Sequence, residues 1–332
     1  MSFSQIRGQD KVIGILQGYI GEARLTGGYL FSGPQGVGKK FIATTLAKAV
    51  NCESLSLDSC DHCPSCLKID KAQHPDVSIV DFNKPITENV GREQADSNAI
   101  RIGHIRSIQH AASLRPYEGR KKVFIIDGAH NLTAEAANAF LKILEEPPRD
   151  TLLILITHKQ NRIFKTIISR CKQVKFSLLP RDELEIILKE EHAVSALEAH
   201  FLAYFCEGRL GSALGLKDSQ ILKEKNSIID RWGLLRRPRL DGFLLQNKEE
   251  ARDFMNVLSS WFRDIYLLKI GMPHAQLVNL DRKEDLLKVM PRFTYNDLNE
   301  IFDFISSGFL YLEQNINMRL LLHNLEALLW KA

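Results

Sequence analysis

Short apolar runs alternate with longer helical patterns over the first 178 residues of the chain. The runs are short enough for strands and lie at residues 29–32, 77–80, 122–127, 152–157 and 174–176. Helical spacing of apolar residues separates them, at residues 39–51, 102–114 and 133–144. This alternation predicts an α/β domain with a parallel sheet over residues 1–178.

The pattern changes after Pro180, and helical periodicity dominates from there to Ala332. One short helical block covers residues 181–217, and the basic segment 236–239 punctuates the longer block that follows. The last stretch, residues 296–330, is amphipathic and rich in leucine, with an expected interruption at Gly308. The second half is therefore predicted to be all-helical.

A glycine-rich loop, G-P-Q-G-V-G-K-K, begins at Gly33 directly after the first predicted strand. In a P-loop the glycines let backbone N–H groups wrap a phosphate, the role expected here of Gly33, Gly36 and Gly38. Lys39 matches the lysine that reaches the β- and γ-phosphates, but Lys40 stands where a hydroxyl would bind Mg²⁺. The strand before the loop and the helix after it favour a P-loop over a chance glycine-rich turn. Mg²⁺-dependent hydrolysis is not expected, whereas nucleotide binding without Mg²⁺ stays open.

The strand at residues 122–127 ends on Asp127, which is the expected Walker B acid at the carboxyl end of the sheet. An ATPase of this kind usually has a glutamate next, to orient the attacking water, and this chain has Gly128. Alternatively, Asp127 only ends a buried strand. Either interpretation predicts a chain without ATPase activity of its own.

Four of the six cysteines follow the spacing C-x7-C-x2-C-x2-C, at Cys52, Cys60, Cys63 and Cys66. Tetrahedral Zn²⁺ takes four thiolates at about 2.3 Å, which leaves no open position for a substrate. This spacing predicts a structural zinc site, the alternative being free buried thiols. Cys171 and Cys206 stand alone, and disulfides are not expected in a cytosolic chain.

The composition excludes some classes of protein but does not itself indicate a function. The chain has 332 residues, with 45% hydrophobic and 25% charged residues, which is ordinary for a globular protein. No apolar run reaches about 18 residues and no secretory signal is visible, so we expect a cytoplasmic protein with no membrane partner. The net charge is only +4, but residues 101–180 alone sum to +8. That stretch is either a solvated basic face or a surface that contacts DNA phosphates.

Taken together, the P-loop and the four-cysteine insertion after its helix resemble the bacterial clamp-loader ATPase subunits, gamma/tau and delta prime. The resemblance continues in the string A-N-A-F-L-K-I-L-E-E-P-P at residues 137–148 and in S-R-C at Ser169–Arg170–Cys171, and it covers about residues 1–178. It implies an AAA+ P-loop domain over residues 1–178 with a zinc module at 52–66. It also implies a small helical lid over 179–218 and a helical collar for oligomerisation over 219–332.

Within this family, Gly-Lys-Lys and Asp-Gly resemble the delta-prime type, a stator-like subunit of the DNA polymerase III clamp loader. The resemblance implies that Arg170, with Ser169, acts as an arginine finger on a neighbouring ATPase subunit; alternatively, Arg170 pairs locally with an acid such as Asp127. The implied partners are the gamma/tau and delta subunits, the beta sliding clamp and primed DNA. Two other hypotheses remain: an ATP-hydrolysing gamma/tau-type motor, and a zinc-containing nucleic-acid-binding protein with a vestigial P-loop.

Overall fold

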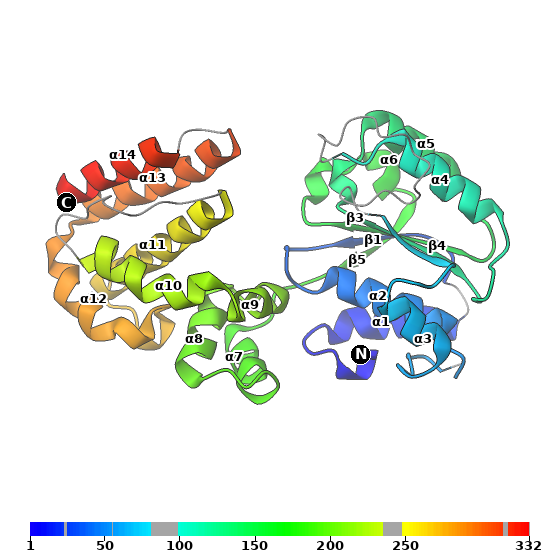
Figure 1. Cartoon of the computed structure of the whole chain (residues 1–332), viewed down its shortest axis with the longest axis horizontal. Helices are drawn as coiled ribbons and strands as arrows, with labels where there is room; N and C mark the ends of the chain where they lie inside the picture. Colours follow the sequence, from blue (N-terminus) through cyan, green and yellow to red (C-terminus); the bar gives the residue numbers. More distant parts are fainter. Residues whose placement is uncertain (23–24, 55, 81–98, 235–247, 315–317, 332) are drawn as a thin grey trace. The chain divides into compact units, whose positions relative to one another are not determined.

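In the computed structural model, the described residues are 1–22, 25–54, 56–80, 99–234, 248–314 and 318–331. They divide into two compact units, Met1–Leu179 and Pro180–Ala332 (Figure 1). The basic segment 236–239 lies outside the described residues. The further division of the second unit into a lid and a collar stays a prediction.

The first unit is built on a sheet whose described strands are all paired in parallel, in the order β2-β3-β4-β1-β5. This agrees with the predicted α/β class. The strands are β1 (Gly27–Ser32), β2 (Val77–Val80), β3 (Lys122–Asp127), β4 (Thr151–Thr157) and β5 (Cys171–Lys175). Because β3, β4 and β1 are adjacent and parallel, their carboxyl ends meet at one edge of the sheet, where ligands bind in open α/β folds.

Helices cover both faces of this sheet (Figure 1). Tyr29 and Phe31 of β1 pack with helices α1 and α2, whereas Leu30 packs on the opposite face with α4 and α5. The alternation explains why the central strands β3 and β4 are almost entirely apolar: each residue enters one of two cores. The helices are α1 (Asp10–Gly21), α2 (Lys39–Asn51), α3 (Pro64–Asp70), α4 (Ile102–Ser113), α5 (Ala134–Glu145) and α6 (Lys165–Ile168).

The described part of the second unit is helical, as predicted. Its core gathers around the fully buried Trp232, Trp261 and Phe262. The helices are α7 (Arg181–Glu190), α8 (Ala196–Phe205), α9 (Leu210–Lys217), α10 (Gln220–Ile228), α11 (Lys248–Lys269), α12 (Lys283–Val289), α13 (Tyr295–Glu313) and α14 (Met318–Lys331), with a π-helix at Ile229–Leu234. Among the described residues, no helix is both long enough and apolar enough to span a membrane.

The expected interruption at Gly308 is wrong, because α13 runs through this residue. A Cβ on Gly308 would lie 2.9 Å from Met255 Sδ of α11, which is closer than real Cβ atoms come. A larger residue there would have to displace the Met255 side chain, so Gly308 allows close packing of α13 on α11 and does not break the helix.

Candidate functional site

The glycine-rich loop lies between β1 and α2 at the carboxyl edge of the sheet, the setting of a P-loop. Gly33 allows a close approach of β5, since a Cβ there would lie 2.5 Å from Phe176 O. Gly38 precedes α2 with φ +89, in the left-handed region that favours glycine, and Gly36 lies in the turn between them. The loop therefore has the backbone features that wrap a phosphate at a helix N-terminus.

Both loop lysines are engaged within the chain. Lys39 is buried, and its Nζ donates to Gly33 O at 2.8 Å and to Pro34 O. Burial lowers the pKa of Lys39 to about 8, although the charge of Asp127 opposes this shift. Lys40 Nζ lies 3.1 Å from Asp127 Oδ2, so the acid at the end of β3 is paired with a lysine of the P-loop.

This arrangement does not fit Mg²⁺. A P-loop site binds the ion through a hydroxyl after the conserved lysine and through the Walker B acid. Here an ammonium replaces the hydroxyl and already neutralises Asp127, and Gly128 supplies no side chain to orient water.

The fold brings to the same edge three residues that no sequence motif singled out. Thr157 ends β4, between β1 and β3, and its Oγ1 lies 3.3 Å from His130 Nδ1. The rings of His130 and His158 meet edge to face, with centroids 4.4 Å apart. Their positions after adjacent parallel strands were the signal that could have found them.

Burial and nearby positive charge lower the pKa of both histidines, which favours their neutral forms. Burial, followed by the charges of His158, Lys159 and Arg162, lowers the pKa of His130 to about 4. Burial together with the charges of Lys159 and Lys39 also lowers the pKa of His158. The charge of Asp127, at the end of β3, opposes the shift at both histidines.

Arg170 lies on the surface just after α6, and its acid partner is Glu145 rather than Asp127. Its Nε and Nη2 lie 2.8 and 2.7 Å from Glu145 Oε1, and Nη1 donates to Thr166 O at 3.1 Å. Ser169 is also exposed, and its Oγ donates to Thr166 O at 3.1 Å. The side chain of Arg170 is 36% exposed, so its guanidinium is held but accessible.

The four cysteines with metal-site spacing come together, with all four Sγ atoms within 4.8 Å of one another. Backbone N–H groups point at the sulfurs: Cys60 N lies 3.3 Å from Cys52 Sγ, and Cys63 N lies 3.3 Å from Cys60 Sγ. Burial raises the pKa of Cys52, but hydrogen bonds from Ser54 and from the Cys60 N–H outweigh it and bring the pKa to about 6. The group fits a tetrahedral metal ion held by thiolates.

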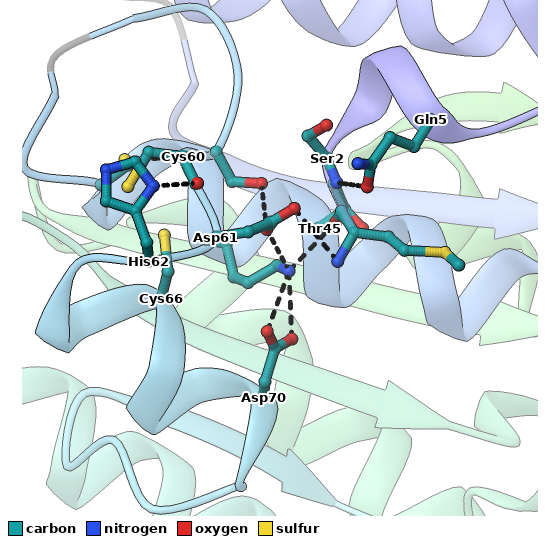
Figure 2. A network of polar contacts seen from close by, with 12 residues as sticks. Ser2, Gln5, Thr45, Cys60, Asp61, His62, Cys66 and Asp70 are labelled. Carbon is teal, nitrogen blue, oxygen red and sulfur yellow. Dashed lines mark hydrogen bonds and ion pairs between the residues drawn. The ribbon is translucent and has the colours of Figure 1, made fainter.

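His62 is not part of this cluster. It is exposed, and its Nδ1 faces Cys60 O (Figure 2).

Several basic residues of the segment 101–180 make contacts within the chain that stabilise the fold. Lys122 is 8% exposed and donates to Ala111 O at 2.7 Å. Arg120 donates to Cys52 O, and the Lys172 ammonium lies 5.2 Å from the Tyr29 ring centroid. Part of the +8 charge is therefore explained without nucleic acid.

Family models match most of the chain. The model described as "DNA polymerase III, delta subunit" matches residues 8–180. The model described as "DNA polymerase III, delta subunit, C terminal" matches residues 240–329.

Individual relatives point the same way. DNA polymerase III subunit delta' of Bacillus subtilis is 29% identical over 79% of this chain and 78% of its own length. DNA polymerase III subunit gamma of Buchnera aphidicola is 30% identical over 77% and 71%. DNA polymerase III subunit tau of Escherichia coli is 35% identical over 66% of this chain, which spans only 33% of tau.

A solved structure supports the fold. The DNA polymerase III gamma subunit-related protein of Thermotoga maritima superposes with a TM-score of 0.51 over 96% of this chain and 98% of its own length, at 17% identity.

Proposed function

Because the chain belongs to the family of DNA polymerase III clamp-loader subunits, we propose that it acts there as a delta-prime-type subunit. In this role it does not hydrolyse ATP itself. It joins gamma/tau and delta subunits in a ring that loads the beta sliding clamp onto primed DNA during replication. The proposed location is the cytoplasm, where replication takes place in bacteria.

The ion pair between Lys40 and Asp127 carries this proposal. In a hydrolysing subunit these two positions hold Mg²⁺ against the phosphates. In this chain the side chains at these two positions form an ion pair with each other instead, and Gly128 cannot orient a water molecule. A subunit that cannot hydrolyse ATP is useful in a clamp loader as a fixed partner for neighbours that can.

Arg170 supports a role in trans. Its guanidinium is planar and permanently charged, which suits the charge that spreads over the phosphoryl oxygens in the transition state. Because the Arg170 side chain is accessible, it can reach a phosphate held by an adjacent subunit.

Exposed apolar side chains support assembly through the second unit. Leu310 and Tyr311 of α13 are 61% and 41% exposed, and Leu320 of α14 is 54% exposed. Burial of these side chains by a partner subunit would remove apolar surface from water, which favours association. We propose that residues 219–332 form the collar of the ring and residues 179–218 the lid.

The proposal also covers the metal, the nucleotide and the DNA contacts of this chain. The four cysteines hold one structural Zn²⁺. Any nucleotide bound at the P-loop is bound without hydrolysis. DNA contacts come from exposed basic residues of the segment 101–180 and act on phosphates without reading sequence.

A motor subunit of the gamma/tau type is the alternative, favoured by the 35% identity to Escherichia coli tau. Lys40 and Gly128 oppose it, because both elements needed for hydrolysis are altered.

One experiment separates these roles. The purified chain is assayed for ATPase, with Lys39→Ala as control, and is mixed with gamma and delta subunits for light scattering. We expect no turnover by the chain alone and one stable complex in the mixture. A turnover of about one per second that Lys39→Ala abolishes would identify a motor instead. Failure to join the other subunits contradicts the clamp-loader role itself.

A further inference from the structure

A buried cation links the cysteine cluster to the P-loop helix. Lys48 lies on α2, and its side chain is 1% exposed. Its ammonium donates to Asp61 Oδ1 at 2.7 Å and lies 3.0 Å from Asp70 Oδ1, with Met1 O accepting a third bond at 3.0 Å. Figure 2 shows Asp61 and Asp70, whose carboxylates make these contacts, together with the cluster residues Cys60 and Cys66.

Both carboxylates belong to the segment that carries the cysteines. Asp61 lies between Cys60 and Cys63, and Asp70 ends helix α3, which carries Cys66. Burial alone would lower the pKa of Lys48, but its bonds to Asp61 and Asp70 outweigh burial and raise it. The P-loop helix therefore buries a charge whose counterions both come from the cysteine segment.

The loop that carries Asp61 needs to be held in place. Asp61 has φ +63, a left-handed conformation that is unusual for a residue other than glycine. Its Oδ1 accepts a bond from Ser59 Oγ at 2.9 Å. Since the cysteines on either side form no disulfide, a metal ion bound to both would add a further constraint on this backbone.

The same loop is also hydrogen-bonded to the N-terminal turn of the chain. Asp58 accepts hydrogen bonds from Phe3 N at 2.7 Å and from Ser4 N at 3.1 Å. Phe3 is 1% exposed and packs in the core that contains α1 and α2. Movement of the loop would therefore disturb two features of α2 together: the ion pairs of Lys48 and the core packing that includes Phe3.

We propose that Lys48 is a positioning residue of the metal centre, and that it couples metal binding at the four cysteines to the stability of the P-loop helix α2. A bound metal fixes the loop so that Asp61 meets Lys48, and the paired Lys48 in turn holds the loop in the shape that gathers the cysteines. Such coupling is reciprocal: whatever the metal adds to the stability of α2, an intact α2 adds to metal affinity. The coupling does not depend on the proposed clamp-loader role.

The test measures metal affinity and local stability in the full chain. Zn²⁺ affinity is measured by competition with a chromophoric chelator, and hydrogen exchange of peptides from α2 is followed with and without Zn²⁺. We expect removal of Zn²⁺ to speed exchange in α2 of the unmodified chain. Lys48→Met and Asp61→Asn should each weaken Zn²⁺ binding about 10- to 100-fold, the usual effect of removing a group that supports the ligands. In Lys48→Met, exchange in α2 should no longer respond to Zn²⁺.

Lys68→Met is the matched control. Lys68 lies on α3, close to the cysteines, but its partner is Glu118 at 2.6 Å and its side chain is 45% exposed. This variant should bind Zn²⁺ and protect α2 as the unmodified chain does. If Lys48→Met does not fold, Asp61→Asn carries the test, because it keeps the lysine; this change weakens the pairing with Lys48 and also the ion pair of Asp61 with the Met1 N-terminus at 3.2 Å.

Several results would overturn the proposal. One is α2 exchange that is identical with and without Zn²⁺ in the unmodified chain, and another is a chain that binds no Zn²⁺ at all. A third is unchanged Zn²⁺ affinity in both Lys48→Met and Asp61→Asn, or in Asp61→Asn alone if Lys48→Met does not fold. An equal loss of affinity in Lys68→Met would show that any charge near the cysteines matters, and not the link to α2.

Discussion

Arg170 allows a test that separates a role in trans from a role in folding. In the structure the guanidinium is paired with Glu145, and the two side chains are 36% and 50% exposed. Exposed ion pairs of this kind contribute about 0.2–1 kcal/mol to the free energy of unfolding. Arg170→Ala and Glu145→Gln both remove this pair, so each should lower the free energy of unfolding by less than about 1 kcal/mol.

The two variants should differ in their effect on ATP hydrolysis by the reconstituted complex. An arginine finger supplied in trans is worth about 10³–10⁵ in rate in the related GTPases. Arg170→Ala should therefore slow the one site that this chain serves by about 10³, while the other sites keep their own fingers. Glu145→Gln keeps the guanidinium and releases it from its local partner, so the rate at that site should equal or exceed that of the unmodified complex.

A single-turnover measurement resolves the site in question. The complex with gamma and delta subunits is mixed with primed DNA and a limiting amount of labelled ATP, and hydrolysis is followed by rapid quenching. Arg170→Ala should add a slow phase and reduce clamp loading, with zinc content and assembly unchanged and with an unfolding temperature close to that of Glu145→Gln. Equal kinetics in the Arg170→Ala and unmodified complexes refute the role in trans. An equal loss in Glu145→Gln would assign the effect to the ion pair instead.

Three further predictions concern the metal, the second unit and pH. Cys63→Ser removes one of four thiolates and should release Zn²⁺ from protein purified without chelator; retention of one zinc per chain in metal analysis contradicts the site. A chain ending at Lys217 should keep its zinc but stay monomeric in light scattering with the partner subunits, and assembly equal to that of the full chain contradicts the collar assignment. Burial and the neighbouring His158 lower the pKa of folded His130 to about 4, so the fold favours the neutral ring. The stabilisation is complete above the ordinary pKa of about 6.5 and is lost as the pH falls towards about 4. The urea midpoint should therefore drop over this window, less steeply in His130→Asn, and equal slopes in the two proteins contradict the assignment.

The sequence predicted the central strands and the edge strand β2 well and the edge strand β5 poorly, for a physical reason. Strands β3 and β4 are buried on both faces, so nearly every residue from Val123 to Ile126 and from Leu152 to Ile156 is apolar. Strand β5 is at the edge of the sheet and begins at Cys171, but only Val174 within it is buried. Its polar residues hide the start of the strand, which the sequence placed three residues late.

Individual site residues were easier to predict than their partners. The alterations at Lys40 and Gly128 are visible in the sequence, but their spacing does not reveal that Lys40 neutralises Asp127. Similarly, Arg170 stood out through its motif, whereas its acid partner depends on how α5 and α6 pack. Such pairs join residues far apart in the chain, so only the folded structure brings them together.

The order of the strands also affects when the P-loop can form during synthesis. Strand β1, which leads into the loop, has β4 on one side and β5 on the other, and more than a hundred residues separate Ser32 from Thr151. The ribosome adds about 5–20 residues per second, so β1 emerges several seconds before either of its neighbours exists. Parallel pairing over such a long loop is also intrinsically slow. Strand β1 therefore waits unpaired during translation, and the sheet can close only when β5 has left the ribosome.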